Sequence, residues 1–352
     1  MSVNSTFTGI NAIIILIISL LMLSTESSYS QQSQPYTQYL FNRFILNPAS
    51  CGADGYTSIG LVTKNQWVGF KDAPANQIFT VQFRMPHEGF GGTRRNYKRL
   101  SLENVGLGVA LFNDMRGPIR TTGGQLTYAY HLELYTGQLS FGLSTSIFQL
   151  YIDREKINTE LGYDKYLDAN KLSSFIPEAA TGVHYTDKDY YVGFSASNLF
   201  QSYLTFGGRS SSDYKLEREY IFLGGYVFDL NIEWSLVPGT QLKFTEHGAF
   251  QIDINAMAYY FDKFWCGLSY KSGGGGAFGG TSMLFGVRLN EYRIGYAFDF
   301  TLSNIQRYSF GSHELMVSIA FGQDGKFYRY NRNNRYGFYE QQYRKKWSSR
   351  RK

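Results

Sequence analysis

Residues 249–261 read AFQIDINAMAYYF, and this stretch decides the fold class. Apolar side chains recur at every second position through Phe250, Ile252 and Ile254, and polar side chains such as Asp253 lie between them. A period of two is that of a β-strand, in which successive side chains point to opposite faces. The stretch therefore predicts a strand with one apolar face and one polar face.

The same alternation recurs between residues 56 and 322, for example at 139–147 and 292–301. The runs extend over roughly 9–14 residues, which suits a tilted membrane strand, whereas strands of soluble proteins have about 5–6 residues. Aromatic residues such as Trp234 and Tyr292 stand at the ends of the apolar faces, as in the interface girdles of membrane barrels. The strands of a soluble β-sandwich also alternate, but a sandwich does not require such long strands or aromatic residues at the ends of the apolar faces. The sequence predicts an all-β fold, a transmembrane antiparallel β-barrel of about 14 strands.

The connections between the predicted strands alternate in length. With a periplasmic N-terminus, five connections predicted inside the periplasm are short: 133–137, 188–189, 232, 262–263 and 290–291. Four connections predicted outside the cell are long: 152–177, 199–217, 272–280 and 302–311. Short periplasmic turns and long external loops are typical of outer-membrane barrels, although the connections 86–104 and 245–248 break the rule. We therefore expect an outer-membrane location with both termini in the periplasm.

The two ends of the chain differ in composition from its body. Of the 352 residues, with a formal net charge of +6, the last 30 hold ten basic and two acidic ones, so the positive charge belongs to the tail. An apolar run at 12–23 precedes Ser28-Tyr29-Ser30, which predicts a secretory signal peptide. We expect four parts: signal peptide 1–30, a periplasmic or lumen-packed segment 31–55, the barrel 56–322, and a basic aromatic periplasmic tail 323–352.

Two details of these ends bear on function. Residues 36–47 are rich in apolar side chains, which argues against a free tail and favours packing inside the barrel. The tail interleaves bases with aromatic residues, but export makes nucleic acid an improbable partner. It is either a solvated tail or a contact for anionic surfaces and acidic partners in the periplasm.

Short blocks of residues recur in a familiar order and spacing along the chain. They are 35–42 (PYTQYLFN), 46–49 (LNPA), 66–70 (QWVGF), 106–108 (GLG), 113–114 (ND), 117–118 (GP), 128–131 (YAYH) and 311–314 (GSHE). Together they resemble the PorP/SprF family of type IX secretion system outer-membrane proteins, from residue 31 to about residue 322. Cys51 and Lys64-Asn65 depart from the family pattern, and the tail lies outside the resemblance.

The resemblance implies a function in protein secretion. It implies a barrel without enzymatic activity or cofactor, whose partners are type IX secretion components, outer-membrane lipid and a secreted cargo. The cargo would carry a type B C-terminal sorting domain, as large surface adhesins do, and some members serve gliding motility. The alternative is a passive diffusion porin, which needs an open lumen that conducts ions.

One candidate site is a set of residues for binding the cargo at the external rim. Aromatic side chains beside a rigid Gly-Pro turn suit such a contact, although an interfacial aromatic girdle would also place them there. The candidate partner-binding residues are Gln66, Trp67, Phe70, Asn113, Asp114 and Pro118.

A second candidate site is a charge network on the predicted lumen face. Arg288 and Arg293 are expected opposite one another across the turn at 290–291, where like charges repel and need a carboxylate or a bound acidic group. The network is either structural or a ligand contact. Its predicted members are Lys243, Asp253, Arg288, Arg293, Asp299 and Glu314.

Catalytic and metal-binding motifs lack the context that they require. Gly274, Gly276 and Gly279 spell G-x-G-x-x-G, but neither a helix nor a Lys-Ser/Thr pair follows. Ser312 and His313 are adjacent in a predicted strand, so they face opposite sides and cannot form a nucleophile–base pair. The five histidines show no metal-ligand spacing, and the two cysteines leave one disulfide open.

Overall fold

The structure is a computed structural model. It describes residues 36–85, 104–153, 156, 173–206, 209–246, 248, 250–273, 280–301 and 309–321. The predicted signal peptide, the basic tail and the Gly274–Gly279 motif lie outside the described residues.

Three short 3-10 helices precede a series of strands. The helices are η1 (Tyr39–Phe41), η2 (Arg43–Ile45) and η3 (Pro48–Ser50). The strands are β1 (Thr57–Asn65), β2 (Ala75–Arg84), β3 (Val105–Arg116), β4 (Ile119–Glu133), β5 (Gly137–Ile152), β6 (Ser173–Asp187), β7 (Tyr190–Ser197), β8 (Tyr203–Phe206), β9 (Arg209–Lys215), β10 (Glu219–Tyr226), β11 (Phe228–Asp229), β12 (Trp234–Thr245), β13 (Phe250–Tyr260), β14 (Phe264–Gly273), β15 (Gly280–Leu289), β16 (Tyr292–Thr301) and β17 (Ser312–Phe321).

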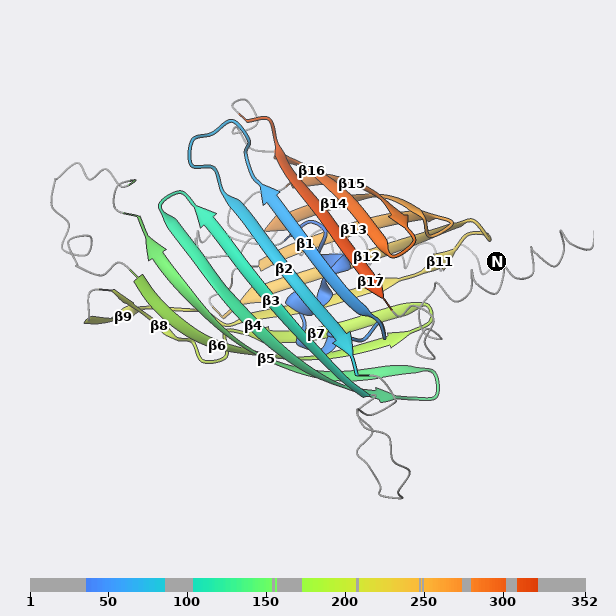
Figure 1. Cartoon of the computed structure of the whole chain (residues 1–352), viewed down its shortest axis with the longest axis horizontal. Helices are drawn as coiled ribbons and strands as arrows, with labels where there is room; N and C mark the ends of the chain where they lie inside the picture. Colours follow the sequence, from blue (N-terminus) through green and yellow to red (C-terminus); the bar gives the residue numbers. More distant parts are fainter. Residues whose placement is uncertain are drawn as a thin grey trace, which may run out of the picture.

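The strands form a closed antiparallel barrel (Figure 1). Each wall strand pairs with its neighbour in the chain, β7 pairs with β10, β10 with β12, and β17 returns to pair with β1 from Thr57↔Phe321 to Asn65↔His313. The two-residue strand β11 pairs with β12 alone, and β8 and β9 form a separate hairpin. Fourteen strands therefore make the wall, and the predicted barrel is confirmed.

The two ends of the barrel differ in their connections. At the short-turn end, pairs of strands are joined by turns such as Lys188–Asp189 and Asn290–Glu291. The opposite end, the long-loop end, carries the segments that join β1 to β2, β5 to β6 and β7 to β10. At this end β3 and β4 extend to a two-residue turn at Gly117-Pro118, so Asn113 and Asp114 belong to β3 and not to a loop. Gly117 has a φ of +58°, as the first position of a tight hairpin turn requires.

The region between β7 and β12 is less regular than the alternation predicts. The expected long loop at 199–217 contains the β8–β9 hairpin, and the single strand expected at 218–231 is divided into β10 and β11. Pairing of β10 with β12 ends at Gly225↔Gly239, one position before Pro238. Because proline has no N–H to donate, the ladder is interrupted at Pro238, and on this side β12 pairs again beyond it only with β11, from Phe228↔Leu236.

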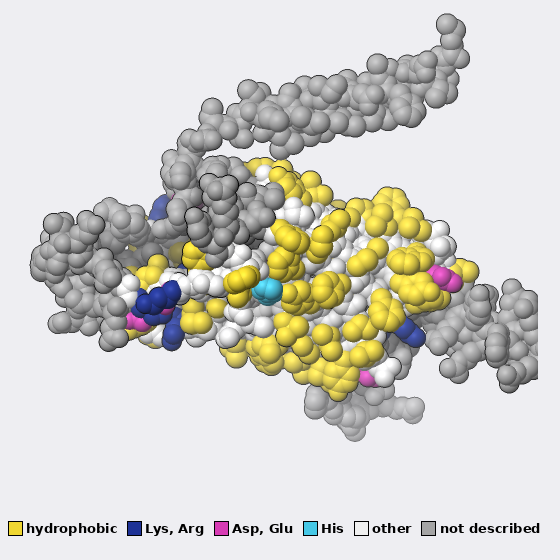
Figure 2. Space-filling view, turned by 90° about the horizontal axis from the view of Figure 1, so that it is seen from above, with side chains coloured by type: hydrophobic (Ala, Val, Ile, Leu, Met, Phe, Trp, Pro, Cys, Tyr) yellow, Lys and Arg dark blue, Asp and Glu magenta, His cyan; other side chains and the backbone are white. Residues whose placement is uncertain are grey.

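The side chains of the wall follow the predicted alternation. In β13, Ile254 is 56% exposed on the outer surface, and the adjacent Asp253 is buried in the lumen. Apolar side chains cover the middle of the face shown in Figure 2, and the Lys, Arg, Asp and Glu side chains on this face lie towards the two ends of the barrel. No helix among the described residues is long and apolar enough to cross a membrane.

The lumen is occupied by the chain's own residues 36–53, called here the lumen segment. Its helices lie inside the barrel (Figure 1), and Phe44 and Cys51 pack in one buried cluster with Val62, Met257 and Met316 of the wall. The segment approaches the strands so closely that a Cβ at Gly142 of β5 would overlap the backbone of Ala49. Glycine at this lumen position therefore makes room for the segment.

Candidate functional site

The lumen segment is held near the long-loop end by a buried carboxylate. Glu314 of β17, only 1% exposed, accepts hydrogen bonds from the backbone N–H groups of Thr37 and Gln38, each at 2.8 Å. The side-chain amide of Gln38 donates to the backbone carbonyl of Glu314 at 3.3 Å. Hydrogen bonds from N–H groups to a carboxylate are stronger than those between neutral groups, so Glu314 fixes the start of the segment.

Charged side chains from three further strands meet at Thr37. Its hydroxyl lies 2.9 and 3.0 Å from the two carboxylate oxygens of Asp299, and it accepts from Lys64 at 3.1 Å and Lys271 at 2.8 Å. Lys64 also forms ion pairs with Asp299 at 2.8 Å and Glu314 at 3.7 Å. We call Thr37, Lys64, Lys271, Asp299 and Glu314 the Thr37 clamp. In the clamp, each buried charge lies close to an opposite charge or a hydrogen-bond partner, as burial in a low dielectric requires.

The structure divides the predicted charge network into three groups. Asp253 lies beside the Thr37 clamp, in register with Lys271 and 2.7 Å from the Ser269 hydroxyl that donates to it. Lys243 forms a separate ion pair with Glu219 at 3.0 Å. The two arginines, 288 and 293, lie near the other end of the barrel.

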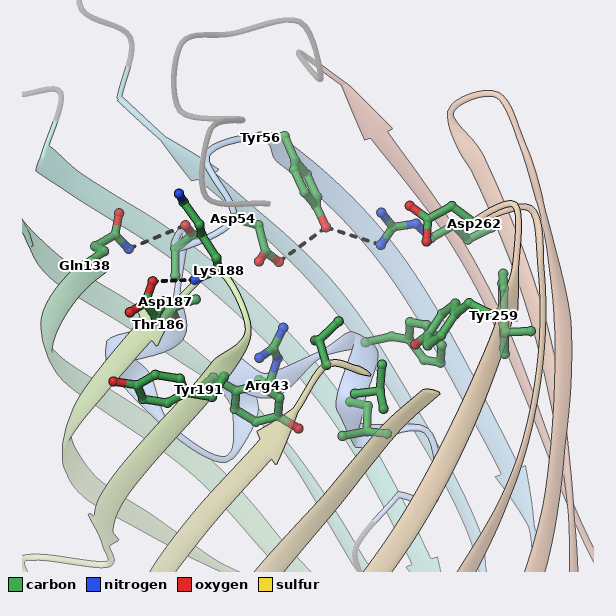
Figure 3. Close-up of a pocket in the computed structure, with 18 of the residues that line it drawn as sticks. Arg43, Asp54, Tyr56, Gln138, Thr186, Asp187, Lys188, Tyr191, Tyr259 and Asp262 are labelled. Carbon is green, nitrogen blue, oxygen red and sulfur yellow. Dashed lines mark hydrogen bonds between the residues drawn. The ribbon is translucent and has the colours of Figure 1, made fainter. Parts of the chain in front are cut away.

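Arg288 and Arg293 are paired in register across the turn between β15 and β16, as expected. An Arg293 nitrogen donates to the Tyr56 hydroxyl at 3.2 Å, and Figure 3 shows this bond as a dashed line. The Arg288 Nε donates to the carbonyl oxygen of Asn290 at 3.3 Å. Both arginines line a cavity that opens at the short-turn end, separate from the Thr37 clamp.

The candidate partner-binding residues at 66–70 form a strap across the rim of the long-loop end. Val68 exchanges backbone hydrogen bonds with the two residues before β17, donating to Gly311 at 2.9 Å and accepting from Phe310 at 2.8 Å. Trp67 has a φ of +46°, and its N–H donates to the Ser312 hydroxyl at 3.2 Å. Phe70 is 41% exposed and Phe310 is 78% exposed. We call residues 66–70 with Phe310 the rim strap.

The candidates at the end of β3 and in the turn after it are divided between the two sides of the wall. Asp114 points inward and accepts from the Asn76 side chain at 2.7 Å, whereas the adjacent Asn113 accepts from the outer Thr122 at 2.9 Å. Pro118 accepts from the backbone N–H of Asp153 at 2.8 Å. The structure therefore brings Gln66, Trp67 and Phe70 together, and separates Asn113 from Asp114.

An exposed ion pair ties the loop after the rim strap to the segment that follows β5. Lys156 Nζ lies 2.6 Å from the Asp72 carboxylate. The hydrogen bond from Lys156 lowers the pKa of Asp72, and the same bond raises the pKa of Lys156. Solvent screens such a pair, so it positions loops more than it stabilises the fold.

Three further sequence features have a clear place in the structure. Ser312 faces the lumen side beneath Trp67, while His313 bonds to the Tyr296 hydroxyl, so the two side chains do not face one another. Cys51 is buried in the lumen and Cys266 is exposed on the outer surface, and both are free thiols. A disulfide between them, left open by the sequence, is absent from this structure.

Comparison with known proteins now decides the family. The sequence pattern of the family described as "Type IX secretion system membrane protein PorP/SprF" matches residues 28–319. The chain belongs to the PorP/SprF family. This PorP/SprF barrel is thus an outer-membrane protein of the type IX secretion system. No curated protein sequence matches the chain.

Solved outer-membrane barrels resemble the PorP/SprF chain only distantly. A mutant of the TodX monoaromatic hydrocarbon channel has 8% identity and a TM-score of 0.45, with 85% of this chain and 96% of that chain covered. The Ralstonia pickettii toluene transporter TbuX has 11% identity and a TM-score of 0.43, covering 79% and 91% of the two chains. The KdgM porin has 8% identity and a TM-score of 0.36, covering 75% and 99%. These similarities say nothing about a substrate.

Sequence reasoning missed the two lysines of the Thr37 clamp and the residue that they surround. A signal for Lys64 existed, because the alternation of β1 places it on the lumen face with Val62. Nothing along the sequence connects Thr37 with Glu314, which is 277 positions away.

Proposed function

We propose that this PorP/SprF barrel supports the export or surface attachment of a cargo protein with a type B C-terminal sorting domain. The cargo is held at the long-loop end, and the lumen does not serve as its path. The proposal gives the barrel no catalytic role.

The observation that carries this proposal is the occupied lumen. The lumen segment packs Phe44 against wall residues of the barrel and is held by Glu314 through two backbone hydrogen bonds. A passive porin needs a continuous aqueous lumen. A barrel filled by its own chain is better suited to holding a partner at its rim than to conducting solutes.

The orientation follows from the connections. Periplasmic turns of outer-membrane barrels are short and external loops are long. We therefore assign the short-turn end, where β17 ends at Phe321, to the periplasm, and the long-loop end to the cell surface. In this orientation the rim strap faces the medium, where an exported cargo is retained.

The rim strap has the properties of a binding surface. Phe70 and Phe310 expose aromatic rings, and the backbone hydrogen bonds of Val68 with Phe310 and Gly311 hold the strap in place. Aromatic anchors on a rigid backbone bind with little loss of conformational entropy. Cargo binding at this strap would leave the lumen segment undisturbed.

Replacing Trp67 and Phe70 by Ala tests the proposal. Loss of two aromatic anchors should reduce surface-retained cargo by roughly tenfold, and the released cargo should accumulate in the medium. Surface proteomics and immunoblotting of the medium measure both. Phe79→Ala is a matched control, since Phe79 is also 41% exposed but lies on the outer wall in β2. Unchanged retention in the double variant, with normal amounts of barrel in the membrane, would show that the cargo binds elsewhere.

A further inference from the structure

A cavity of about 200 Å³ lies at the short-turn end, between the lumen segment and the barrel wall. The turn residues Lys188 and Asp262 form part of its lining, so it lies at the mouth of the barrel. Figure 3 shows side chains from the lumen segment, from the residues before β1 and from several strands around this space. We call it the mouth cavity.

Arg43 of η2 points into the mouth cavity from the lumen segment (Figure 3). Its guanidinium lies 4.4 Å from the centre of the Tyr191 ring, which holds it in place. Among the residues that the structure describes, this guanidinium forms neither an ion pair nor a hydrogen bond. The nearby Asp54 instead accepts from the Tyr56 hydroxyl at 3.2 Å. A guanidinium has five N–H donors, and no acceptor for those of Arg43 lies among the described residues.

The rest of the lining also offers more donors than acceptors. Four cationic side chains line the cavity, against three carboxylates. Asp187 accepts from the backbone N–H of Lys188 at 2.6 Å. The indole N–H of Trp265 is buried, and no acceptor for it lies among the described residues. Arg293 adds a second guanidinium, bonded to the neutral Tyr56 hydroxyl.

We infer that the mouth cavity binds a carboxylate-bearing ligand. The planar fork of a guanidinium matches the two oxygens of a carboxylate, and both Arg43 and Arg293 line the cavity. The aromatic rings of Tyr191 and Tyr259 supply apolar walls for the carbon part of the ligand. The carboxylate comes either from an acidic polypeptide segment or from a small organic acid, since the cavity holds only a few heavy atoms.

Calorimetric titration of the full-length protein in detergent micelles tests the inference. The probes are glutarate, a glutamate-rich hexapeptide and inorganic phosphate. We expect glutarate and the peptide to bind, and we expect binding to weaken with added salt. Peptide binding much tighter than that of glutarate assigns the carboxylate to a polypeptide, and equal affinities assign it to a small acid.

Variants connect the binding to the cavity. Arg43→Gln and Arg293→Gln should each weaken glutarate binding about tenfold, as the loss of a charge-assisted hydrogen bond does. Arg120→Gln is the control, because it removes one positive charge at the exposed start of β4 near the long-loop end. The two arginine variants lie on different elements, so misfolding of one leaves the other informative. The inference is overturned if neither acid binds, if both variants bind as the unaltered protein does, or if phosphate binds as tightly as glutarate.

Discussion

The charged side chains at the two ends of the lumen differ in how they are paired. At the Thr37 clamp, Lys64 forms ion pairs with two carboxylates, and Glu314 accepts two backbone N–H groups. At the mouth cavity, Arg43 stacks on Tyr191 without an ion pair among the described residues. The same lumen segment carries Thr37 near its start and Arg43 near its middle. The segment is thus fixed internally at Thr37, whereas Arg43 presents unused hydrogen-bond donors to the mouth cavity.

This difference indicates which charges are structural. A buried ion pair with complete hydrogen bonding is costly to break, because the remaining partner stays buried and uncompensated. A cation that forms no ion pair among the described residues keeps its hydrogen-bond donors available for a ligand. Stability should therefore depend on the Thr37 clamp, and ligand binding on the mouth cavity.

The largest effect is expected from Glu314→Gln. It removes the negative charge that faces Lys64 and weakens the bonds to the Thr37 and Gln38 N–H groups, so the free energy of unfolding should fall by about 3 kcal/mol. Denaturant unfolding of the micellar protein measures this. Arg43→Gln at the mouth breaks no ion pair and should lower stability by at most about 1 kcal/mol. Equal losses for the two variants would contradict the contrast between the ends.

A smaller effect is expected from Gly142→Ala in β5, which faces Ala49 of the lumen segment. The added methyl group would overlap the backbone of Ala49, and overpacking of this kind costs about 1–3 kcal/mol. The segment should become more accessible, measured as faster hydrogen exchange of the backbone at 47–51. Gly124→Ala in β4 is the control, since its nearest contact would be the flexible end of Leu111 at 3.3 Å. Identical exchange in both variants would mean that the segment is not seated against β5.

The smallest effect is expected from the exposed pair between Asp72 and Lys156. The pKa of Asp72 is lowered in the folded protein, so its carboxylate is ionised and paired at any pH above the usual carboxyl pKa. The pair is lost as the pH falls through the lowered pKa. Asp72→Asn should leave the unfolding midpoint unchanged and only loosen the loop after the rim strap. Spin-label mobility at residue 71 between pH 7 and pH 2 follows this loosening. A large drop in stability at neutral pH would show that the long-loop end relies on surface charge after all.

Much of the barrel could be predicted because the alternation of apolar and polar side chains is a property of neighbouring residues. In β13, the alternation of Ile254 and Asp253 predicts which side chain faces lipid and which faces the lumen. The same rule could have shown that Asn113 and Asp114 face opposite sides, so grouping them in one site neglected available information. How far β3 and β4 extend towards Gly117-Pro118 depends on their pairing with one another, which neighbouring residues along the chain do not show. Pairing also decides where β10 ends, at the level of Pro238.

By itself, the sequence determined the period of two, the number of wall strands and the side of the wall on which each charge lies. These features follow from backbone geometry within each strand, so they can be predicted from residues that are close together in the sequence. Only the tertiary structure decided that Glu314 holds Thr37, that Lys64 and Lys271 complete this clamp, and that Arg43 lacks an ion pair. Such contacts join residues far apart in the chain, and they exist only once β17 has paired with β1 and the lumen segment lies inside the closed wall.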